Sequence, residues 1–127
     1  MKKILLILVS AFILTSCQSK NDFYYKGDSN NWYAEIFTQK NGDQELKSYK
    51  IKYIGENLET LKNKDISFSF QSENSLQGPI IKKLSESGTL ESNSPSACGG
   101  CDFLNKDSEI IFTIEWNGEK EEIILKN

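Results

Sequence analysis

The stretch that decides the fold runs from Glu109 to Gly118 and reads Glu-Ile-Ile-Phe-Thr-Ile-Glu-Trp-Asn-Gly. Every second residue from Ile110 to Trp116 is a large apolar one, and this period of two predicts a strand with one buried face. Asn117-Gly118 follows, and both residues tolerate the positive φ angles of a type I′ turn. The alternation then resumes over 121–126, with Ile123 and Leu125 on one face. The sequence therefore predicts a β-hairpin at this end of the chain.

The same period of two occurs further upstream. Residues 32–38, 46–54 and 65–71 are predicted strands, and a weak strand is expected around Thr89-Leu90. Residues 55–64 are predicted to be a connection with one helical turn. Gly78-Pro79 interrupts the chain, and residues 80–84 fit either a strand or a short helix.

Several short strands without a long amphipathic helix predict an all-β fold. We expect an antiparallel Ig-like or related Greek-key β-sandwich of about seven strands. A small barrel is the second choice, because strand patterns alone do not distinguish the two arrangements.

The first residues have the organisation of an export signal. Lys2 and Lys3 precede an apolar run over 4–14, which is shorter than the roughly 20 residues of a membrane span. Leu14-Thr15-Ser16-Cys17 resembles the lipobox of bacterial lipoprotein signal peptides at every position. The resemblance implies a diacylglyceryl thioether on Cys17 and cleavage before it. The alternative is an ordinary secretory signal, or a short uncleaved anchor, with a chance cysteine.

This resemblance sets the expected organisation of the chain. Residues 1–16 would be a signal peptide, 17–22 a tether, and 23–127 the β-sandwich domain. The partner of Cys17 would be the membrane, since two acyl chains hold a protein there stably. The expected location is the cell membrane, lipid-anchored on its extracytoplasmic face.

Charge and composition exclude several functions. All fifteen basic residues are lysines, and the chain has no histidine. Without residues 1–16, thirteen lysines face eighteen carboxylates, a net charge of −5 that does not favour a nucleic-acid partner. The lack of histidine excludes Ser-His and Cys-His nucleophiles and imidazole metal sites. We therefore expect no enzyme, no cofactor and no metal centre.

Cys98 and Cys101, separated by two glycines, allow three interpretations. We favour a structural disulfide, because the exported chain enters a compartment where disulfides persist. A redox-active pair is the second, since this is the spacing of thiol–disulfide oxidoreductases, although the strand patterns around it are unlike their context. Metal binding is the third: two thiolates supply half of a structural zinc site, and copper(I) between two thiolates is conceivable.

Three other groups of residues are candidates for a binding or catalytic role. Tyr24-Tyr25 with Asn30-Asn31-Trp32 suits a carbohydrate-stacking or partner-binding face, but core and edge aromatics are the favoured interpretation. Residues 41–45 only faintly resemble a calcium loop and are predicted to be a turn. The acids Glu119, Glu121 and Glu122 are predicted to keep the final strand soluble rather than to form a glycosidase pair.

A looser resemblance covers most of the mature chain. Cys98-Gly99-Gly100-Cys101 followed by 109–118, together with 27–32, is similar to small lipoproteins of Bacillus-type bacteria, a likeness that implies their topology and location but no activity. The predicted function is thus a non-enzymatic binding or scaffold domain for an unknown envelope protein or small ligand. The alternative is a thiol-redox or copper-handling lipoprotein acting through Cys98 and Cys101.

Overall fold

The computed structural model describes residues 22–127 apart from 43, 74, 93–95 and 100–103. Within these residues the chain forms nine β-strands and one short 3-10 helix. The elements are β1 (Asp22–Asp28), β2 (Trp32–Asn41), β3 (Gln44–Tyr53), η1 (Leu58–Leu61), β4 (Asp65–Ser72), β5 (Ser75–Lys83), β6 (Thr89–Glu91), β7 (Ser96–Gly99), β8 (Glu109–Trp116) and β9 (Glu119–Lys126).

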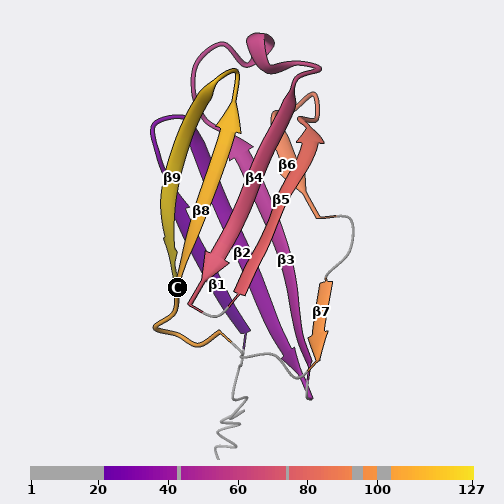
Figure 1. The fold of residues 1–127 in the computed structure, drawn as a ribbon, viewed down its shortest axis with the longest axis vertical. Helices are drawn as coiled ribbons and strands as arrows, with labels where there is room; N and C mark the ends of the chain where they lie inside the picture. Colours follow the sequence, from indigo (N-terminus) through magenta and orange to yellow (C-terminus); the bar gives the residue numbers. More distant parts are fainter. Residues whose placement is uncertain (1–21, 43, 74, 93–95, 100–103) are drawn as a thin grey trace, which may run out of the picture.

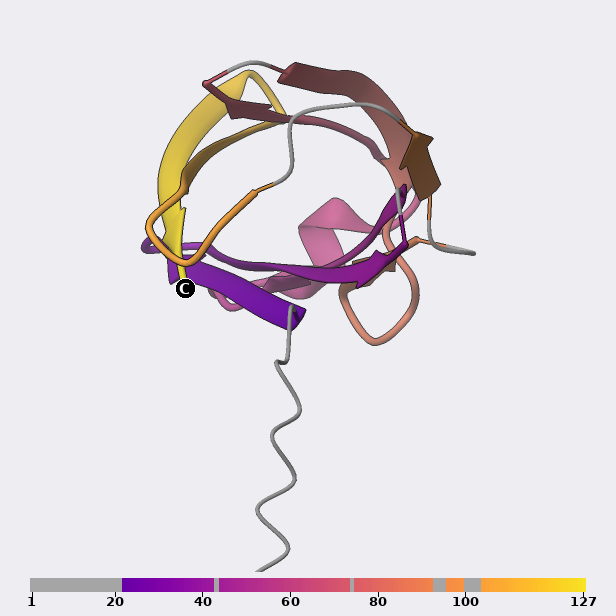
Figure 2. The same ribbon diagram turned by 90° about the horizontal axis from the view of Figure 1, so that it is seen from below.

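All the described strands belong to one antiparallel sheet (Figure 1). The strand order is β5-β4-β8-β9-β1-β2-β3-β6, and β7 pairs with the same edge of β3 as β6 does. Seen from below, the sheet curls into a ring, with β4 and β5 across from β1 and β2 (Figure 2). The link between its two halves is the pairing of β9 with β1, where Lys26 lies opposite Lys126.

The all-β, antiparallel prediction is confirmed. The arrangement differs from an Ig-like sandwich because the β1–β9 pairing joins all strands into a single sheet, which brings the fold closer to a small barrel. The physical reason is strand twist: a twisted sheet of this length curls, and pairing β9 with β1 leaves neither of them as an exposed edge. Two separate sheets would have left one edge of β1 and one edge of β9 unpaired.

The predicted hairpin is confirmed as β8–β9. Trp116 lies opposite Glu119, and the two residues between them have positive φ angles, 46° at Asn117 and 78° at Gly118. These are the angles that an Asn-Gly turn of type I′ requires. The hairpin is internal to the sheet, since β8 also pairs with β4 and β9 also pairs with β1.

The region around Gly78-Pro79 is a strand rather than a break. β5 continues through both residues and pairs with β4, with a shift in register between Phe68 and Phe70. Gly78 has a φ of 110°, and a Cβ there would lie 2.9 Å from the carbonyl oxygen of Phe68. Glycine is therefore required where β5 crosses this irregularity.

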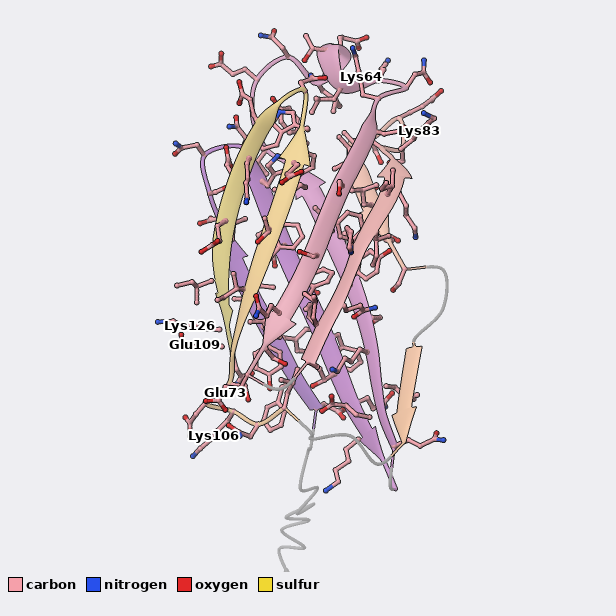
Figure 3. The ribbon with its side chains drawn as sticks, in the orientation of Figure 1. Lys64, Glu73, Lys83, Lys106, Glu109 and Lys126 are labelled. Atoms are coloured by element: carbon pink, nitrogen blue, oxygen red, sulfur yellow. The ribbon has the colours of Figure 1, made fainter. Side chains whose placement is uncertain are left out.

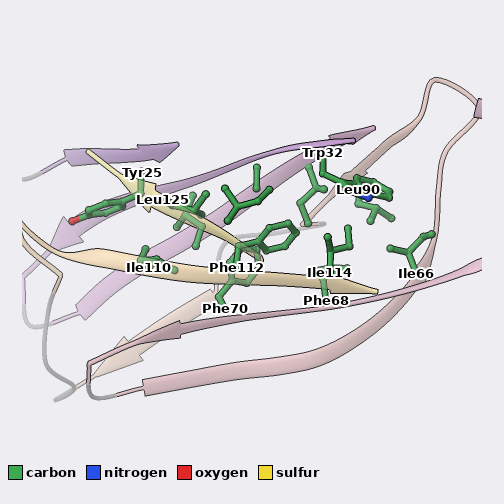
Figure 4. Packing of buried hydrophobic residues seen from close by; sticks show 14 of the residues in the cluster. Tyr25, Trp32, Ile66, Phe68, Phe70, Leu90, Ile110, Phe112, Ile114 and Leu125 are labelled. Carbon is green, nitrogen blue, oxygen red and sulfur yellow. The ribbon is translucent and has the colours of Figure 1, made fainter. Parts of the chain in front are cut away.

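The interior of the ring holds an aromatic core (Figure 4). The ring centroid of Phe112 on β8 lies 5.0 Å from that of Phe70 and 6.2 Å from that of Phe68, both on β4. Towards the other end, Trp32 meets Trp116 edge-on at 5.6 Å. Burying each such side chain contributes about 1.5–3 kcal/mol, so this core is the main source of stability.

Charged side chains form a row around the outside of the sheet, which we call the charge row. Its members are register neighbours on six consecutive strands, namely Glu109, Lys126, Lys26, Glu35, Lys50 and Glu91. Figure 3 shows Glu109 beside Lys126, whose Nζ lies 3.5 Å from the glutamate Oε1. Exposed ion pairs contribute at most about 1 kcal/mol, and Lys26 and Lys126 are like charges opposite each other, so the charge row adds little to the stability of the domain.

Candidate functional site

The predicted site residues fall mostly outside the part of the chain that the structure describes. Cys17 and Cys101 lie outside the described residues, and for Cys98 the structure gives only its backbone position in β7. The lipidation and the disulfide therefore stay predictions on structural grounds. The described residues next to the cysteine pair are nevertheless informative.

A buried carboxylate belongs to the residue that lies opposite Cys98 in the backbone register. Glu45 is on β3, directly opposite Cys98 in the β3–β7 register, and its side chain is only 4% exposed. Its Oε2 accepts a hydrogen bond of 2.8 Å from the backbone N–H of Leu104, and its Oε1 lies 3.3 Å from Nζ of Lys47. A buried carboxylate requires such partners, because an unpaired one would be strongly disfavoured by the loss of hydration.

Two hydroxyl groups lie near Glu45. The Tyr25 hydroxyl donates to the carbonyl oxygen of Asn105 at 2.5 Å. Burial, and secondly the charge of Glu45, raise the pKa of Tyr25 to about 12, and the hydroxyls of Ser108 and Thr38 oppose that rise only in part. Thr38 is buried, and its Oγ1 makes no hydrogen bond of normal geometry to a described residue. We call Tyr25, Thr38, Glu45 and Lys47 the polar cluster.

The polar cluster fixes the chain on both sides of the cysteine pair. Before the pair, the strand containing Cys98 is hydrogen-bonded to β3 opposite Glu45. After the pair, Leu104 and Asn105 are held by Glu45 and Tyr25. Glu45 thus pairs through its backbone with β7 before the cysteine pair, and its carboxylate accepts a hydrogen bond from Leu104 after the pair. Chemically, the arrangement can position the cysteine segment and can influence the ionisation of groups near it.

Sequence reasoning did not find the polar cluster. The sequence predicts a turn over residues 41–45; the structure has a turn at Gly42, and Glu45 lies inside β3. The available signal was its phase, since Glu45 and Lys47 occupy the same alternating positions as the inward-facing Tyr49 and Ile51. Among the described residues, no group of three or more acidic, cysteine or histidine side chains is placed to hold a metal ion.

The other aromatic and acidic candidates have structural roles. Trp32 and Tyr25 are fully buried, in agreement with core aromatics, while Tyr24 is 48% exposed on the outer face. Glu121 is not only a solubilising charge: its Oε2 accepts a 2.5 Å hydrogen bond from Nδ2 of Asn31, and its Oε1 accepts one from the Ser29 hydroxyl. It therefore holds the β1–β2 turn against β9.

The ring of strands has one side without backbone pairing, which we call the seam. Among the described strands β5 pairs only with β4, and its other edge faces the β3 edge that carries β6 and β7. Side chains span the seam: Lys82 of β5 donates through Nζ to the carbonyl oxygen of Glu91 at 3.2 Å and lies 5.4 Å from the ring centroid of Tyr49. Leu76 and Ile81 of β5 are each 65% exposed.

Comparison with known proteins identifies one segment. Residues 1–18 match the family model of the prokaryotic membrane lipoprotein lipid attachment site. No curated protein and no solved structure matches the chain. In the described part of the chain, no helix is long and apolar enough to cross a membrane. Cys17 is the cysteine within the matched residues, and the chain is a bacterial lipoprotein that a lipidated cysteine anchors to the membrane.

Proposed function

We propose that this lipoprotein is a non-enzymatic binding domain on the extracytoplasmic face of the cell membrane, and that it binds an extended segment of an envelope protein along the seam. The observation that carries the proposal is the free edge of β5, a nine-residue strand on which Leu76 and Ile81 are each 65% exposed. Exposed strand edges bind extended peptides by adding a strand to the sheet, with apolar side chains providing specificity.

The composition of β5 limits where a peptide would pair. Pro79 has no N–H to donate, so it protects the middle of the edge, as prolines do on edge strands generally. Residues 80–83 keep their backbone N–H groups, and Ile81 lies among them. The aromatic core occupies the interior of the ring, which favours an outer or edge surface as the binding site.

The experiment is photo-crosslinking in intact cells, with a photoreactive residue in place of Ile81. The matched control is Ile124 on β9, which is 51% exposed but belongs to a strand paired on both sides. We expect one discrete crosslinked protein from position 81 and none from position 124. Ile81→Asp should abolish co-purification of that protein, whereas Ile124→Asp should not. Equal crosslinking from both positions would refute the seam as the binding surface.

The extracytoplasmic location has its own test. The lipid attachment site supports it, because diacylglyceryl transfer to a lipobox cysteine belongs to exported chains. Protease added to intact protoplasts or spheroplasts should digest the domain without cell lysis. Full protection that ends only on lysis would contradict this part of the proposal.

A thiol-redox or copper-handling role is the second candidate, and one observation favours it: the chain is held on both sides of the cysteine pair, since β7 with Cys98 pairs with β3 and the N–H of Leu104 donates to Glu45. The carboxylate of Glu45 would disfavour a thiolate close to it, because like charges repel, so the reactivity of the pair has to be measured. Titration of free thiols across redox buffers would test this role. A potential near that of thioredoxin, or copper that co-purifies with the protein, would support it, whereas a disulfide that resists reduction would favour a structural pair.

A further inference from the structure

The outer face of the sheet carries an apolar patch at the end where the lipid tether enters. Tyr24 of β1 lies opposite Phe37 of β2, and their ring centroids are 4.6 Å apart. Leu46 of β3 is a diagonal neighbour of Phe37, since Leu46 pairs with Gln39 in the same register. Tyr24 is 48% exposed, and Phe37 and Leu46 are half-buried. We call these three residues the tether-side patch.

The length of the tether limits where this patch can lie. Five residue steps separate Cys17 from Asp22, the first residue of β1. A fully extended chain spans at most about 3.3–3.6 Å per residue, so Asp22 is held within about 18 Å of the lipidated cysteine. Tyr24 follows two residues later, and the patch therefore stays within reach of the membrane surface.

The chemistry of the patch fits the boundary between headgroups and acyl chains. Tyrosine presents an apolar ring with a polar hydroxyl, a combination that suits membrane interfaces. Nζ of Lys26 lies 6.0 Å from the centre of the Tyr24 ring, and Lys26 is paired across β1–β9 with Lys126. Lysines beside apolar surface extend their ammonium groups towards headgroup phosphates, and anionic lipids attract them.

We propose that the tether-side patch docks against the bilayer that holds the lipid of Cys17, so that the domain has a fixed orientation on the membrane. The charge row, which includes Lys26, Glu35 and Lys50, borders the patch on the side away from the tether and limits the depth of insertion. Across the ring from β1 and β2, β5 then faces away from the bilayer (Figure 2). The inference depends on the lipid anchor and is independent of any peptide bound at the seam.

The test uses tryptophan fluorescence of the lipidated protein in vesicles of phosphatidylcholine and phosphatidylglycerol. Tyr24→Trp introduces a reporter in the patch, and Ile81→Trp introduces a control in β5. Trp32 and Trp116 are buried and common to both proteins, so the signal of the unsubstituted protein can be subtracted. Lipids with brominated acyl chains quench tryptophans in the bilayer, and iodide quenches those in water.

We expect the tryptophan at position 24 to be quenched several-fold more by brominated lipid than the one at position 81, with the opposite order for iodide. Phe37→Trp gives a second reporter in the same patch and should behave like Tyr24→Trp, which guards against a folding defect in either variant. Equal quenching by brominated lipid at positions 24, 37 and 81 would overturn the proposal. So would stronger quenching at position 81.

Discussion

The β8–β9 hairpin and the β5 strand both contain isoleucine side chains, but they are held in different ways. The hairpin has hydrogen-bonded neighbours on both sides, β4 and β1, and its inward side chains lie in the centre of the core. Among the described strands, β5 has a backbone partner on one side only, and side chains such as that of Lys82 make contacts across the seam. Apolar residues on its outer face are the most exposed large apolar ones described.

The number of paired edges affects both the stability of a strand and how readily it can bind a partner. A strand paired on both sides opens only when much of the sheet opens, whereas an edge strand held by side chains can open locally at a lower free energy. Regions that bind partners are commonly drawn from the less stable parts of a fold. The hairpin is therefore expected to carry the stability of the domain, and β5 its interactions.

The largest effect should come from Phe112→Ala in β8. Phe112 is fully buried between Phe68 and Phe70, and its truncation should lower the free energy of unfolding by about 3–5 kcal/mol. Leu76→Ala in the exposed part of β5 should change it by less than about 0.5 kcal/mol. Urea unfolding followed by circular dichroism measures both, and similar losses would contradict the comparison.

The next effect concerns alkaline pH and the polar cluster. The pKa of Tyr25 is raised to about 12 from 10.0, so between these values the unfolded chain releases a proton that the folded one keeps. Stability from this group is therefore complete below pH 10 and is lost as the pH rises towards 12, by on the order of 2 kcal/mol. Tyr25→Phe should flatten this decline in thermal unfolding curves. A decline of unchanged slope in Tyr25→Phe would contradict this assignment.

A smaller effect is expected at the hairpin turn. Gly118 has a φ of 78°, and a Cβ there would have no heavy atom within 4 Å, so Gly118→Ala tests backbone strain without a steric clash. The expected loss is about 1 kcal/mol, because alanine resists positive φ. Asn117→Gly keeps the turn conformation accessible and is the control. An unchanged melting temperature for Gly118→Ala would argue against the type I′ turn.

The smallest change in global stability should come from Lys82→Met at the seam. Losing the hydrogen bond to the Glu91 carbonyl should cost less than about 1 kcal/mol overall. Amide hydrogen exchange at residues 80–83 should nevertheless become faster, because the seam opens more easily. Lys83→Met, which removes the outward ion pair of Lys83 with Asp65, is the matched control and should leave that exchange unchanged. Equal acceleration in both variants would remove the special role of Lys82.

The sequence predicted the strands whose own residues alternate between apolar and polar. The clearest were β8 and β9, where alternation and Asn-Gly agree, and β2, β3 and β4 followed from the same period. β1 was not predicted as a strand, because Gly27 and the flanking aspartates weaken its pattern. For residues 80–84 the pattern fits either a strand or a short helix, and Gly78-Pro79 indicates a break, whereas the irregular pairing with β4 accommodates both residues within β5.

The polar cluster depends on contacts that a local pattern cannot contain. Glu45 is buried because the N–H of Leu104, fifty-nine residues later, donates to it. The closure of the sheet is equally non-local, since β1 and β9 come from opposite ends of the described chain. The lipid attachment site, in contrast, is encoded in consecutive residues and was predicted from them and confirmed.

The first and last strands of the described chain bring Tyr24 next to Asn127, which affects where a label can be attached. The backbone N–H of Tyr24 donates a hydrogen bond of 3.3 Å to the side-chain Oδ1 of Asn127. A fluorescent protein or affinity tag joined after Asn127 would start beside the tether, crowded against the lipid surface and against the tether-side patch. An insertion in the η1 connection, at the opposite end in Figure 1, would leave that surface clear.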